Sequence, residues 1–317
     1  MKENVLIVHD RFTEEQFATV SEFCRQQGWT ANWVRSAAEA APFVSEATII
    51  HSTKADLIPQ AENLRWFSSA SAGVNTYLPY LKPETLLTNS AGAFGVSIAE
   101  HIIMVALMML RKMPECQENI ARHDWVRPDY QESLYGHRIT VVGTGDIGTS
   151  FAVRVKAFQP EKLIGVSRSS RQKEPFDACY SIDKLDELLP QTDLLVLCVP
   201  DTKETRGLMT AERIALLPQT ARLINVGRGT VLDEDALMKA LNSHQLAGAA
   251  LDVFQTEPLP VNSALYLTEN LIITPHCSGN LIIDYTRNKN FQMFYDNLVH
   301  YAKGEPMEHV VDKDREY

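Results

Sequence analysis

Short apolar segments alternate with segments of helix length along almost the whole chain, and this rhythm restricts the fold more than any other feature. In the N-terminal third, the segments that read as strands are Val5–Val8, Ala31–Val34, Thr48–His51, Leu64–Ser68 and Leu86–Thr88. Strands that alternate with helices run parallel, because each helix carries the chain back across a face of the sheet. Thr13 and Gln16 form a capping-box pattern, which predicts a first helix from this threonine to about Gln27.

A second series of the same kind begins near residue 139. Its predicted strands are Ile139–Val142, Leu163–Val166, Leu194–Cys198, Arg222–Val226, Gly248–Asp252 and Leu271–Thr274. The chain has 317 residues, which agrees with two domains at roughly 150 residues each. The predicted fold class is therefore α/β, with two doubly wound parallel-sheet domains.

An apolar helix and a polar segment separate the two series. From Val96 to about Met113 the residues are apolar on nearly every side, so this helix must be covered all round. It is either a core helix between the domains or one that also contributes to a dimer interface. The polar segment runs from Glu115 to His137, and a last helix is predicted over Tyr285–Lys303.

Composition excludes several classes of protein. The 30 Lys and Arg against 40 Asp and Glu give a net charge of −10, which disfavours a nucleic-acid partner because phosphate binding needs clustered positive charge. The five cysteines are scattered without a Cys-x-x-Cys pair, as expected of reduced thiols. The start lacks a signal-peptide pattern, and the longest apolar run, Ile102–Leu110, is about half of the ~18 residues that suggest a membrane span. We therefore expect a soluble cytoplasmic protein with no nucleic-acid or membrane partner.

The sharpest local motif is a glycine-rich turn between a predicted strand and a predicted helix. Gly143, Gly145 and Gly148 fill the pattern Gly-x-Gly-x-x-Gly. The first glycine permits the tight turn, the second lets a pyrophosphate approach the backbone, and the third lets helix and strand pack closely. Asp146 and Ile147 open the helix, whose free amides suit a phosphate. The motif predicts a dinucleotide cofactor.

The second strand of this series ends where an NAD site normally offers Asp or Glu to the ribose 2′-hydroxyl. The residues there are Ser167, Arg168 and Ser169, followed by Arg171, and no carboxylate is available. A guanidinium can bind a 2′-phosphate through two hydrogen bonds, and serine hydroxyls can donate to it. We therefore expect a preference for NADP(H) with Arg168 as the main phosphate ligand, while use of NAD(H) stays open. A solvated basic loop is the alternative.

The ordered set of motifs resembles the D-isomer-specific 2-hydroxyacid dehydrogenase family over nearly the whole chain. Besides the glycine turn, the motifs are Ser71–Val74, Ile98–His101, Asn225–Gly229, Ala250–Phe254, Glu257–Pro258 and Thr274–Gly279. The family fold implies a Rossmann cofactor domain inserted into a flavodoxin-like substrate domain. Residues 1–99 and 284–317 would then form the discontinuous substrate domain, and residues 100–283 the NADP-binding domain.

The resemblance also implies a reaction, which is hydride transfer from NAD(P)H to C2 of a small 2-oxo acid to give the D-2-hydroxy acid. Arg228 would bind the substrate carboxylate and polarise the carbonyl. His276 would be the general acid and base, because imidazole titrates near neutral pH. Glu257 would bond to the far ring nitrogen, orient the ring and favour its protonated form. The backbone amides expected to complete the carboxylate site are those of Ala72, Gly73 and Val74.

Around the cofactor, the resemblance places Asp252 near the nicotinamide carboxamide and ribose, and Thr205 near phosphate or ribose. The other contacts that it implies are Val199 and Pro200 on the adenosine side, Val226 and Gly227 against the nicotinamide, and Gly279 near the nicotinamide amide. No metal is expected, because no His or Cys pair has chelating spacing and hydride transfer needs none.

Several functions stay open at this point. The segment Pro275–Gly279 and the pair Ser167–Arg168 look closer to the glyoxylate/hydroxypyruvate reductase branch, while a phosphoglycerate dehydrogenase-like enzyme is the alternative. A non-catalytic dinucleotide-sensing interaction protein is the alternative from another class, because the family resembles co-repressors of the same fold. A serine hydrolase is disfavoured, because Ser69–Gly73 lacks the first glycine of Gly-x-Ser-x-Gly. The expected partners are a small 2-oxo or 2-hydroxy acid and a second copy of the chain in a homodimer.

Overall fold

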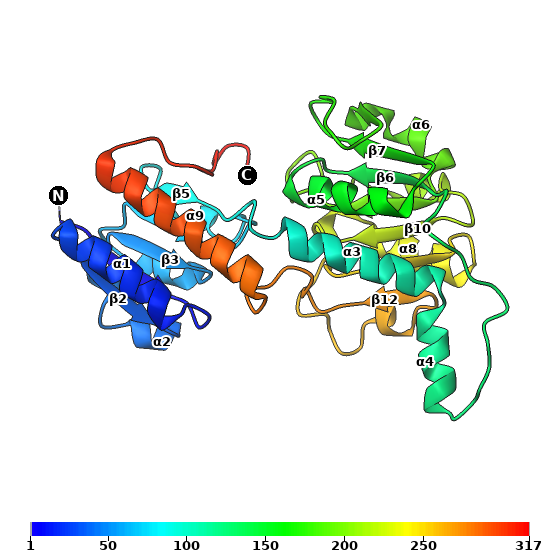
Figure 1. Ribbon diagram of the computed structural model, residues 1–317, viewed down its shortest axis with the longest axis horizontal. Helices are drawn as coiled ribbons and strands as arrows, with labels where there is room; N and C mark the ends of the chain where they lie inside the picture. The colour runs from blue at the N-terminus through cyan, green and yellow to red at the C-terminus, as the bar shows by residue number, and fades with distance from the viewer. Residues whose placement is uncertain (1, 317) are drawn as a thin grey trace. The chain divides into compact units, whose positions relative to one another are not determined.

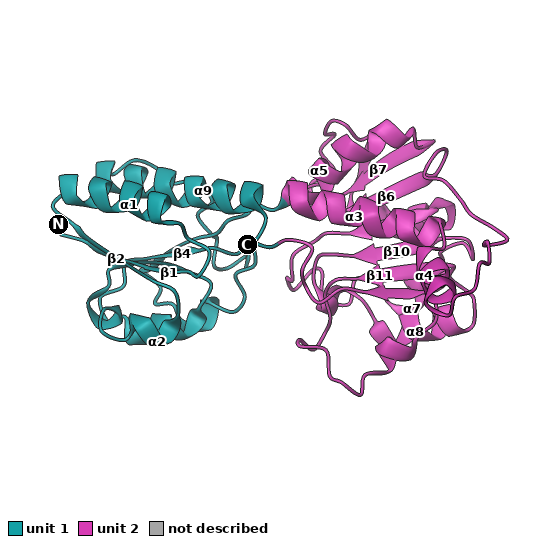
Figure 2. Cartoon of the chain, turned by 60° about the horizontal axis from the view of Figure 1, so that its bottom comes forward, with its two compact units in different colours: residues 1–94, 280–317 teal, residues 95–279 magenta. Residues whose placement is uncertain are grey.

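The computed structural model describes residues 2–316, and the chain divides into two compact units (Figure 2). Unit 1 comprises Met1–Phe94 and Asn280–Tyr317, and unit 2 comprises Gly95–Gly279. The expected domain boundaries, after residues 99 and 283, lie five and four residues beyond these junctions. The first difference has a simple cause, because one continuous helix starts at Gly95 and belongs to unit 2 from its first residue.

Unit 1 is built on a five-stranded parallel sheet with the order β2-β1-β3-β4-β5. Its strands are β1 Asn4–Val8, β2 Thr30–Val34, β3 Ile49–Ser52, β4 Trp66–Ser69 and β5 Leu86–Thr88. These are the five strands predicted for this region, with ends shifted by at most two residues. The central strands β1 and β3 are almost entirely buried, as expected of a parallel sheet covered on both faces.

Two long helices, α1 (Glu14–Gln26) and α9 (Asp284–Lys303), lie side by side on one face of this sheet, and the short α2 (Ala37–Ala40) lies on the other (Figures 1 and 2). The rings of Phe23 and Tyr295 meet edge to face between α1 and α9, with centroids 5.8 Å apart. The C-terminal helix therefore completes the core of the N-terminal unit.

Unit 2 holds a seven-stranded parallel sheet with the order β12-β11-β10-β9-β6-β7-β8. Its strands are β6 Arg138–Val142, β7 Lys162–Val166, β8 Ala178–Tyr180, β9 Leu194–Leu197, β10 Arg222–Asn225, β11 Gly248–Leu251 and β12 Leu271–Ile273. Six were predicted to within one residue at each end, whereas β8 was missed because it is a three-residue edge strand. The strand order reverses between β6 and β9, and ligands of doubly wound sheets bind at such a reversal.

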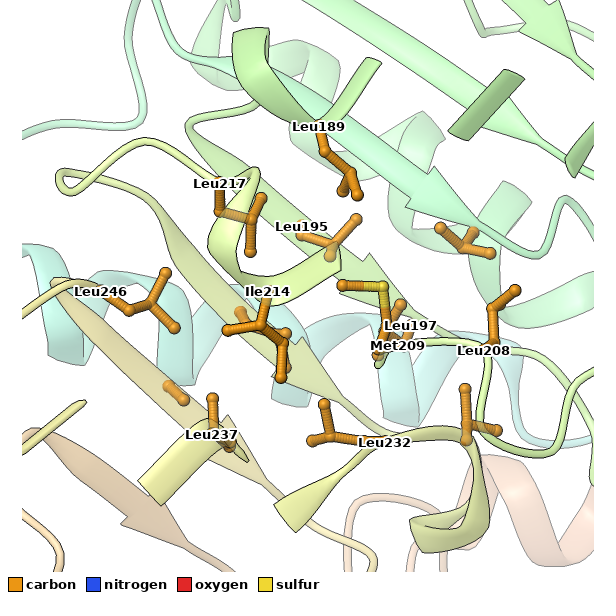
Figure 3. Packing of buried hydrophobic residues seen from close by; sticks show 14 of the residues in the cluster. Leu189, Leu195, Leu197, Leu208, Met209, Ile214, Leu217, Leu232, Leu237 and Leu246 are labelled. Atoms are coloured by element: carbon orange, nitrogen blue, oxygen red, sulfur yellow. The ribbon is translucent and has the colours of Figure 1, made fainter. Parts of the chain in front are cut away.

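Helices cover both faces of the unit 2 sheet. They are α3 Gly95–Leu110, α4 Met113–Ala121, α5 Asp146–Val155, α6 Leu185–Leu188, α7 Ala211–Ala215 and α8 Glu234–Asn242. Figure 3 shows the core on one face, where Leu195 and Leu197 of β9 pack with Ile214 of α7 and Leu237 of α8. The part of the chain that the structure describes contains no helix long and apolar enough to cross a lipid bilayer.

The apolar helix α3 departs from the prediction in two respects. It ends at Leu110 rather than near Met113, because Pro114 cannot continue a helix and instead occupies the first turn of α4. It is also not covered all round, since Met104 is 46% exposed. Further exposed apolar side chains follow it in unit 2, namely Met113, Ile120, Trp125, Val126, Tyr130 and Tyr135.

Candidate active site

The predicted site residues of unit 2 follow the carboxyl ends of neighbouring strands. In the order of the sheet they are His276 after β12, Asp252 after β11, Arg228 after β10, Val199 after β9, Gly143 after β6 and Ser167 after β7. All these strands are parallel, so their carboxyl ends form one edge of the sheet. The structure therefore brings the proposed catalytic and cofactor residues into one row that crosses the reversal between β6 and β9.

The three glycines of the turn after β6 have different packing. Gly143 has φ +108°, and a Cβ on it would lie 2.6 Å from the Cys198 carbonyl oxygen. A Cβ on Gly148 would lie 1.9 Å from the Gly143 carbonyl oxygen, whereas one on Gly145 would meet nothing within 4 Å. The first and third glycines are thus required by the protein itself, and the second leaves open space.

The open space lies at the N-terminus of α5. Gly145 is the N-cap of this ten-residue helix and provides no side-chain hydrogen bond to its first amides. Unsatisfied amides and the positive end of the helix dipole favour an anion at this position. The turn therefore fits the pyrophosphate of a dinucleotide, with Asp146 and Ile147 in the first turn of the helix.

The end of β7 carries a second feature that fits a phosphate. The Ser167 hydroxyl oxygen is buried and has no hydrogen-bond partner among residues 2–316. Lys173, further along the same loop, donates from Nζ to the Thr144 carbonyl within the glycine turn at 2.9 Å. Arg168 and Ser169 are both exposed. The sequence did not single out Lys173, because its proximity to the turn depends on how the loop folds back.

The residues directly after β7 carry no carboxylate, but another part of the chain brings one close to Arg168. Glu204, in the loop after β9, places its Oε2 3.8 Å from the Arg168 Nη1. Glu204 is 36 residues from Arg168 in the sequence, so the residues after β7 alone do not reveal this carboxylate. In the same loop, the Thr205 hydroxyl donates to the Pro200 carbonyl at 2.6 Å, so it also holds the loop together.

Arg228 lies in a turn that a neighbouring side chain fixes. The buried Asn225 donates from Nδ2 to the Arg228 carbonyl at 2.9 Å and accepts from the Gly227 amide at 3.1 Å. A Cβ on Gly229 would lie 1.9 Å from the Phe254 carbonyl carbon, and one on Gly227 would lie 2.6 Å from the Val199 carbonyl oxygen. Asn225 therefore positions the turn that carries Arg228, a role that the Asn225–Gly229 motif alone does not reveal.

His276 and Glu257 form the closest ionisable pair at this edge. The His276 Nδ1 lies 2.6 Å from the Glu257 Oε2, and the other oxygen of Glu257 accepts from the Phe254 amide at 2.8 Å. Both carboxylate oxygens are therefore engaged, which fixes the carboxylate against the ring. Nε2 is left as the ring atom that can exchange a proton with a substrate.

Asp252 organises the loop that carries the histidine. Its carboxylate is buried and accepts hydrogen bonds from the Thr274 hydroxyl at 2.6 Å, the Cys277 amide at 2.9 Å and the Ser278 amide at 3.0 Å. The backbone carbonyl of Asp252 also accepts from the His276 amide at 2.9 Å. Desolvation, with a smaller contribution from the Asp252 carboxylate, raises the pKa of the Cys277 thiol, so this thiol stays neutral at pH 7.

A cavity of about 460 Å³ reaches the histidine and glutamate from within unit 2. Most of its lining is apolar, and the lining residues are Phe254, Glu257, Pro258, Leu259, Tyr266, Ile273, Pro275 and His276. Among the described residues, no group of three or more His, Cys, Asp or Glu side chains is arranged to hold a metal ion.

The remaining predicted residues fall on both units. Ala72, Gly73 and Val74 follow β4 in unit 1, where Asn89 donates from Nδ2 to the Ala72 carbonyl at 3.0 Å. Val226 is buried directly after β10, and Gly279 is the last residue of unit 2.

Comparisons with known proteins agree with this geometry. A profile described as D-isomer specific 2-hydroxyacid dehydrogenase, NAD binding domain, matches residues 103–278. A glyoxylate reductase of Thermofilum pendens is 32% identical over 267 residues, which cover 82% of this chain and 78% of that protein. A D-3-phosphoglycerate dehydrogenase of Synechocystis is 33% identical over 227 residues, covering 71% of this chain. The chain spans only 41% of that second relative's length.

Solved structures extend the likeness to the whole fold. A D-isomer specific 2-hydroxyacid dehydrogenase family protein of Aeromonas salmonicida has a TM-score of 0.88 and 32% identity, covering 99% of this chain and 100% of that one. An NADPH-dependent glyoxylate/hydroxypyruvate reductase of Sinorhizobium meliloti, solved with NADP and sulfate, has a TM-score of 0.84 and 27% identity over the full length of both chains.

The fold, the glycine turn and the profile match together define an NAD(P)-dependent oxidoreductase. Within that class, the chain belongs to the D-isomer specific 2-hydroxyacid dehydrogenase family.

Proposed function

We propose that the protein reduces a small 2-oxo acid of the glyoxylate or hydroxypyruvate type to the D-2-hydroxy acid, with NADPH preferred over NADH. The observation that carries the catalytic part is the 2.6 Å contact between His276 Nδ1 and Glu257 Oε2 at the carboxyl edge of the unit 2 sheet. The substrate class is supported by the glyoxylate reductases of Thermofilum pendens and Pyrococcus furiosus among the relatives.

The reduction needs a hydride, a proton and a fixed substrate. The nicotinamide supplies the hydride to C2 when the cofactor is bound. His276 donates a proton from Nε2 to the oxygen that becomes the hydroxyl, and its ring is left neutral. Glu257 keeps the ring oriented and favours its protonated form before the transfer. Arg228 binds the substrate carboxylate, which brings C2 and its oxygen to this pair.

The cofactor would be held along the rest of the edge. Gly143, Gly145 and Gly148 would form the pyrophosphate site, and Ser167 and Arg168 would bind the 2′-phosphate. The unpartnered Ser167 hydroxyl supports this assignment, because a phosphate oxygen would give it an acceptor. Residues 100–283, which nearly coincide with unit 2, would thus form the NADP-binding domain.

Steady-state oxidation of NADPH and of NADH against a panel of 2-oxo acids tests the proposal. We expect the highest kcat/KM with glyoxylate or hydroxypyruvate and NADPH. The variant His276→Ala should lower kcat by about 10²- to 10⁴-fold while NADPH still binds. The matched control is His244→Ala, since His244 is an exposed histidine between α8 and β11, at the opposite end of the strand from the site. Near wild-type turnover by pure His276→Ala protein would refute the role of His276.

Two other functions give different results in this assay. Phosphoglycerate dehydrogenases of Synechocystis and Bacillus subtilis, 33% and 32% identical to the chain, favour D-3-phosphoglycerate as a candidate substrate. In the reverse direction, with NADP⁺ or NAD⁺ as the hydride acceptor, faster oxidation of this compound than of glycolate or D-glycerate would favour that enzyme. Tight NADPH binding without turnover of any acid in the panel would favour a dinucleotide-sensing protein.

We also propose a homodimer formed through the exposed apolar side chains of unit 2, including Ile120, Trp125 and Tyr130. Trp125 is 87% exposed, and several other exposed apolar side chains lie near it in the sequence, between Met113 and Tyr135. Exposed apolar patches mark protein interfaces. Sedimentation should give twice the chain mass of 35.6 kDa. Trp125→Glu should shift the protein towards the monomer, whereas Leu267→Glu, at an equally exposed leucine, should not. A wild-type monomer at micromolar concentration would contradict this proposal.

A further inference from the structure

Two opposite charges meet where the 2′ substituent of the cofactor ribose is expected. Arg168 follows β7 and Glu204 lies in the loop after β9, on the other side of β6 in the sheet. The Arg168 Nη1 and the Glu204 Oε2 are 3.8 Å apart, with side chains 56% and 68% exposed. Both groups can therefore rearrange at little cost, since exposed ion pairs are weak.

Arg168 and Glu204 are the two residue types that proteins use to distinguish NADPH from NADH at the ribose 2′ position. A guanidinium recognises a 2′-phosphate, whereas a carboxylate accepts a hydrogen bond from a 2′-hydroxyl. A 2′-phosphate carries a charge of about −1.5 to −2 at pH 7, as other phosphomonoesters do, so it attracts Arg168 and repels Glu204. With a 2′-hydroxyl, Glu204 can stay beside Arg168 and neutralise it.

We propose that Glu204 is a specificity-determining residue, whose carboxylate competes with the 2′-phosphate for Arg168 and so limits the preference for NADPH over NADH. This inference rests on the proposed binding of the 2′-phosphate by Arg168. The other donors at this strand end act in the opposite direction. Ser167 has a buried hydroxyl without a partner among the described residues, and Lys173 places its ammonium group at the glycine turn.

Glu204→Gln keeps the size of the side chain and removes its charge. Glu204 is exposed, so folding should not change. Titration calorimetry gives the affinities for NADPH, NADH, adenosine 2′,5′-bisphosphate and adenosine 5′-monophosphate. We expect the two ligands with a 2′-phosphate to bind about three- to tenfold more tightly to the variant, as the loss of one weak exposed ion pair and one repulsion allows. NADH and the monophosphate should change by less than about twofold.

Arg168→Ala is the second arm of the experiment. It should weaken binding of NADPH and the bisphosphate by about tenfold or more, because a charge-assisted bond to phosphate is lost. When Arg168 is already alanine, Glu204→Gln should raise the affinity for NADPH and the bisphosphate much less. The logarithm of the fold-change in affinity should be about half or less of that in the wild-type background, because the competition needs both charges. An equal gain in both backgrounds would overturn the competition.

Glu187→Gln is the matched control. Its side chain is 67% exposed and forms a surface ion pair with Lys184 at 2.7 Å, so the variant makes the same charge change elsewhere in unit 2. It should leave all four affinities unchanged. If Glu204→Gln leaves the NADPH to NADH affinity ratio unchanged while Arg168→Ala lowers it, the inference is wrong and the proposed NADPH preference stands. If Arg168→Ala also leaves the ratio unchanged, the assignment of the 2′-phosphate site is wrong, and the inference fails with it.

Discussion

The first turn between strand and helix is built in opposite ways in the two units. In unit 1, the N-terminus of α1 is closed by its own side chains, because Thr13 accepts from the Gln16 amide and the Gln16 side chain accepts from the Thr13 amide. In unit 2, the N-cap of α5 is Gly145, which offers no side chain. Two similar parallel-sheet folds therefore differ in whether the amides of the first helix are left for a ligand.

The two units also differ in the buried polar group at the carboxyl edge of their sheets, which is His51 in unit 1 and Asp252 in unit 2. His51, in β3 of unit 1, is fully buried, lies 3.1 Å from the Ser68 hydroxyl through Nδ1, and stacks on Phe294 with centroids 4.2 Å apart. Burial lowers the pKa of His51 to about 3, so its ring is neutral in the folded protein. The carboxylate of Asp252 in unit 2 instead accepts three hydrogen bonds from the loop that carries His276, the proposed general acid. In unit 1 a neutral ring packs at the carboxyl edge of the sheet, whereas in unit 2 a carboxylate at that edge holds the loop that carries His276.

Of the changes that test this contrast, we expect the largest effect from removing the charge of the Asp252 carboxylate. Asp252→Asn replaces one acceptor oxygen with an NH₂ group that faces the amide donors of the loop from Thr274 to Ser278. We expect kcat to fall by about 100-fold, because small displacements of a catalytic group have effects of this size. The KM for the 2-oxo acid should change by less than about threefold, since Arg228 is untouched. Steady-state kinetics and thermal unfolding of the same preparation check both expectations.

Asp233→Asn is the control for this substitution. Asp233 is also a carboxylate that accepts from a backbone amide, at the N-cap of α8, and asparagine is an equally good cap. Its kcat should remain that of the wild type. A kcat of Asp252→Asn within about twofold of the wild type would show that the loop keeps its position without the carboxylate.

The second prediction compares alanine substitutions at two glycines of the turn after β6, Gly148 and Gly145. Gly148→Ala would place a Cβ 1.9 Å from the Gly143 carbonyl, so α5 must move away from β6. We expect a loss of about 3 kcal/mol of stability, at the upper end for overpacking, together with loss of NADPH binding. Gly145→Ala meets nothing in the protein, so its unfolding temperature should stay the same while NADPH affinity falls by about tenfold. Calorimetric unfolding and NADPH titration distinguish the two variants, and equal unfolding temperatures would contradict the packing argument.

The structure at the start of both helices, α1 and α5, could be predicted from short sequence patterns. The Thr13 capping box is local, since its hydrogen bonds join residues three positions apart. The glycine pattern from Gly143 to Gly148 is also short enough to be read from the sequence, although the packing that requires Gly143 involves the distant Cys198. The ion pair of Arg168 with Glu204 could not be predicted, because it depends on the loops after β7 and β9 folding beside each other. The role of Asn225 was missed for a related reason, since a motif shows which residue is present and not what its side chain bonds to.

The third prediction concerns the closed edge of unit 1 and pH. The folded protein keeps His51 neutral down to about pH 3, whereas the unfolded chain binds a proton near the ordinary value of 6.5. The unfolded state therefore holds the extra proton between these values, and stability falls as the pH falls, by about 1.4 kcal/mol per pH unit. His51→Gln should remove about one proton from this slope. Urea unfolding between about pH 4 and 6, which lies between the two pKa values, measures it.

His244→Gln is the control for the pH experiment, because His244 is an exposed histidine in unit 2, outside the proposed dimer interface. It should leave the slope unchanged. The buried His9 also has a lowered pKa, chiefly because of burial, so a part of the acid sensitivity should remain in His51→Gln. An unaltered slope in His51→Gln would mean that the neutral ring is not a source of the pH dependence.

The smallest expected effect tests the closed helix terminus directly. Thr13→Ala removes the hydroxyl that accepts from the Gln16 amide, so α1 loses its cap and stability should fall by about 1 kcal/mol. Because this helix end belongs to unit 1 and is already satisfied by its own side chains, NADPH affinity should not change. The Thr13→Ser variant retains the hydroxyl and should restore most of the stability. If Thr13→Ala weakened NADPH binding as much as Gly145→Ala does, the contrast between a closed and an open helix terminus would fail.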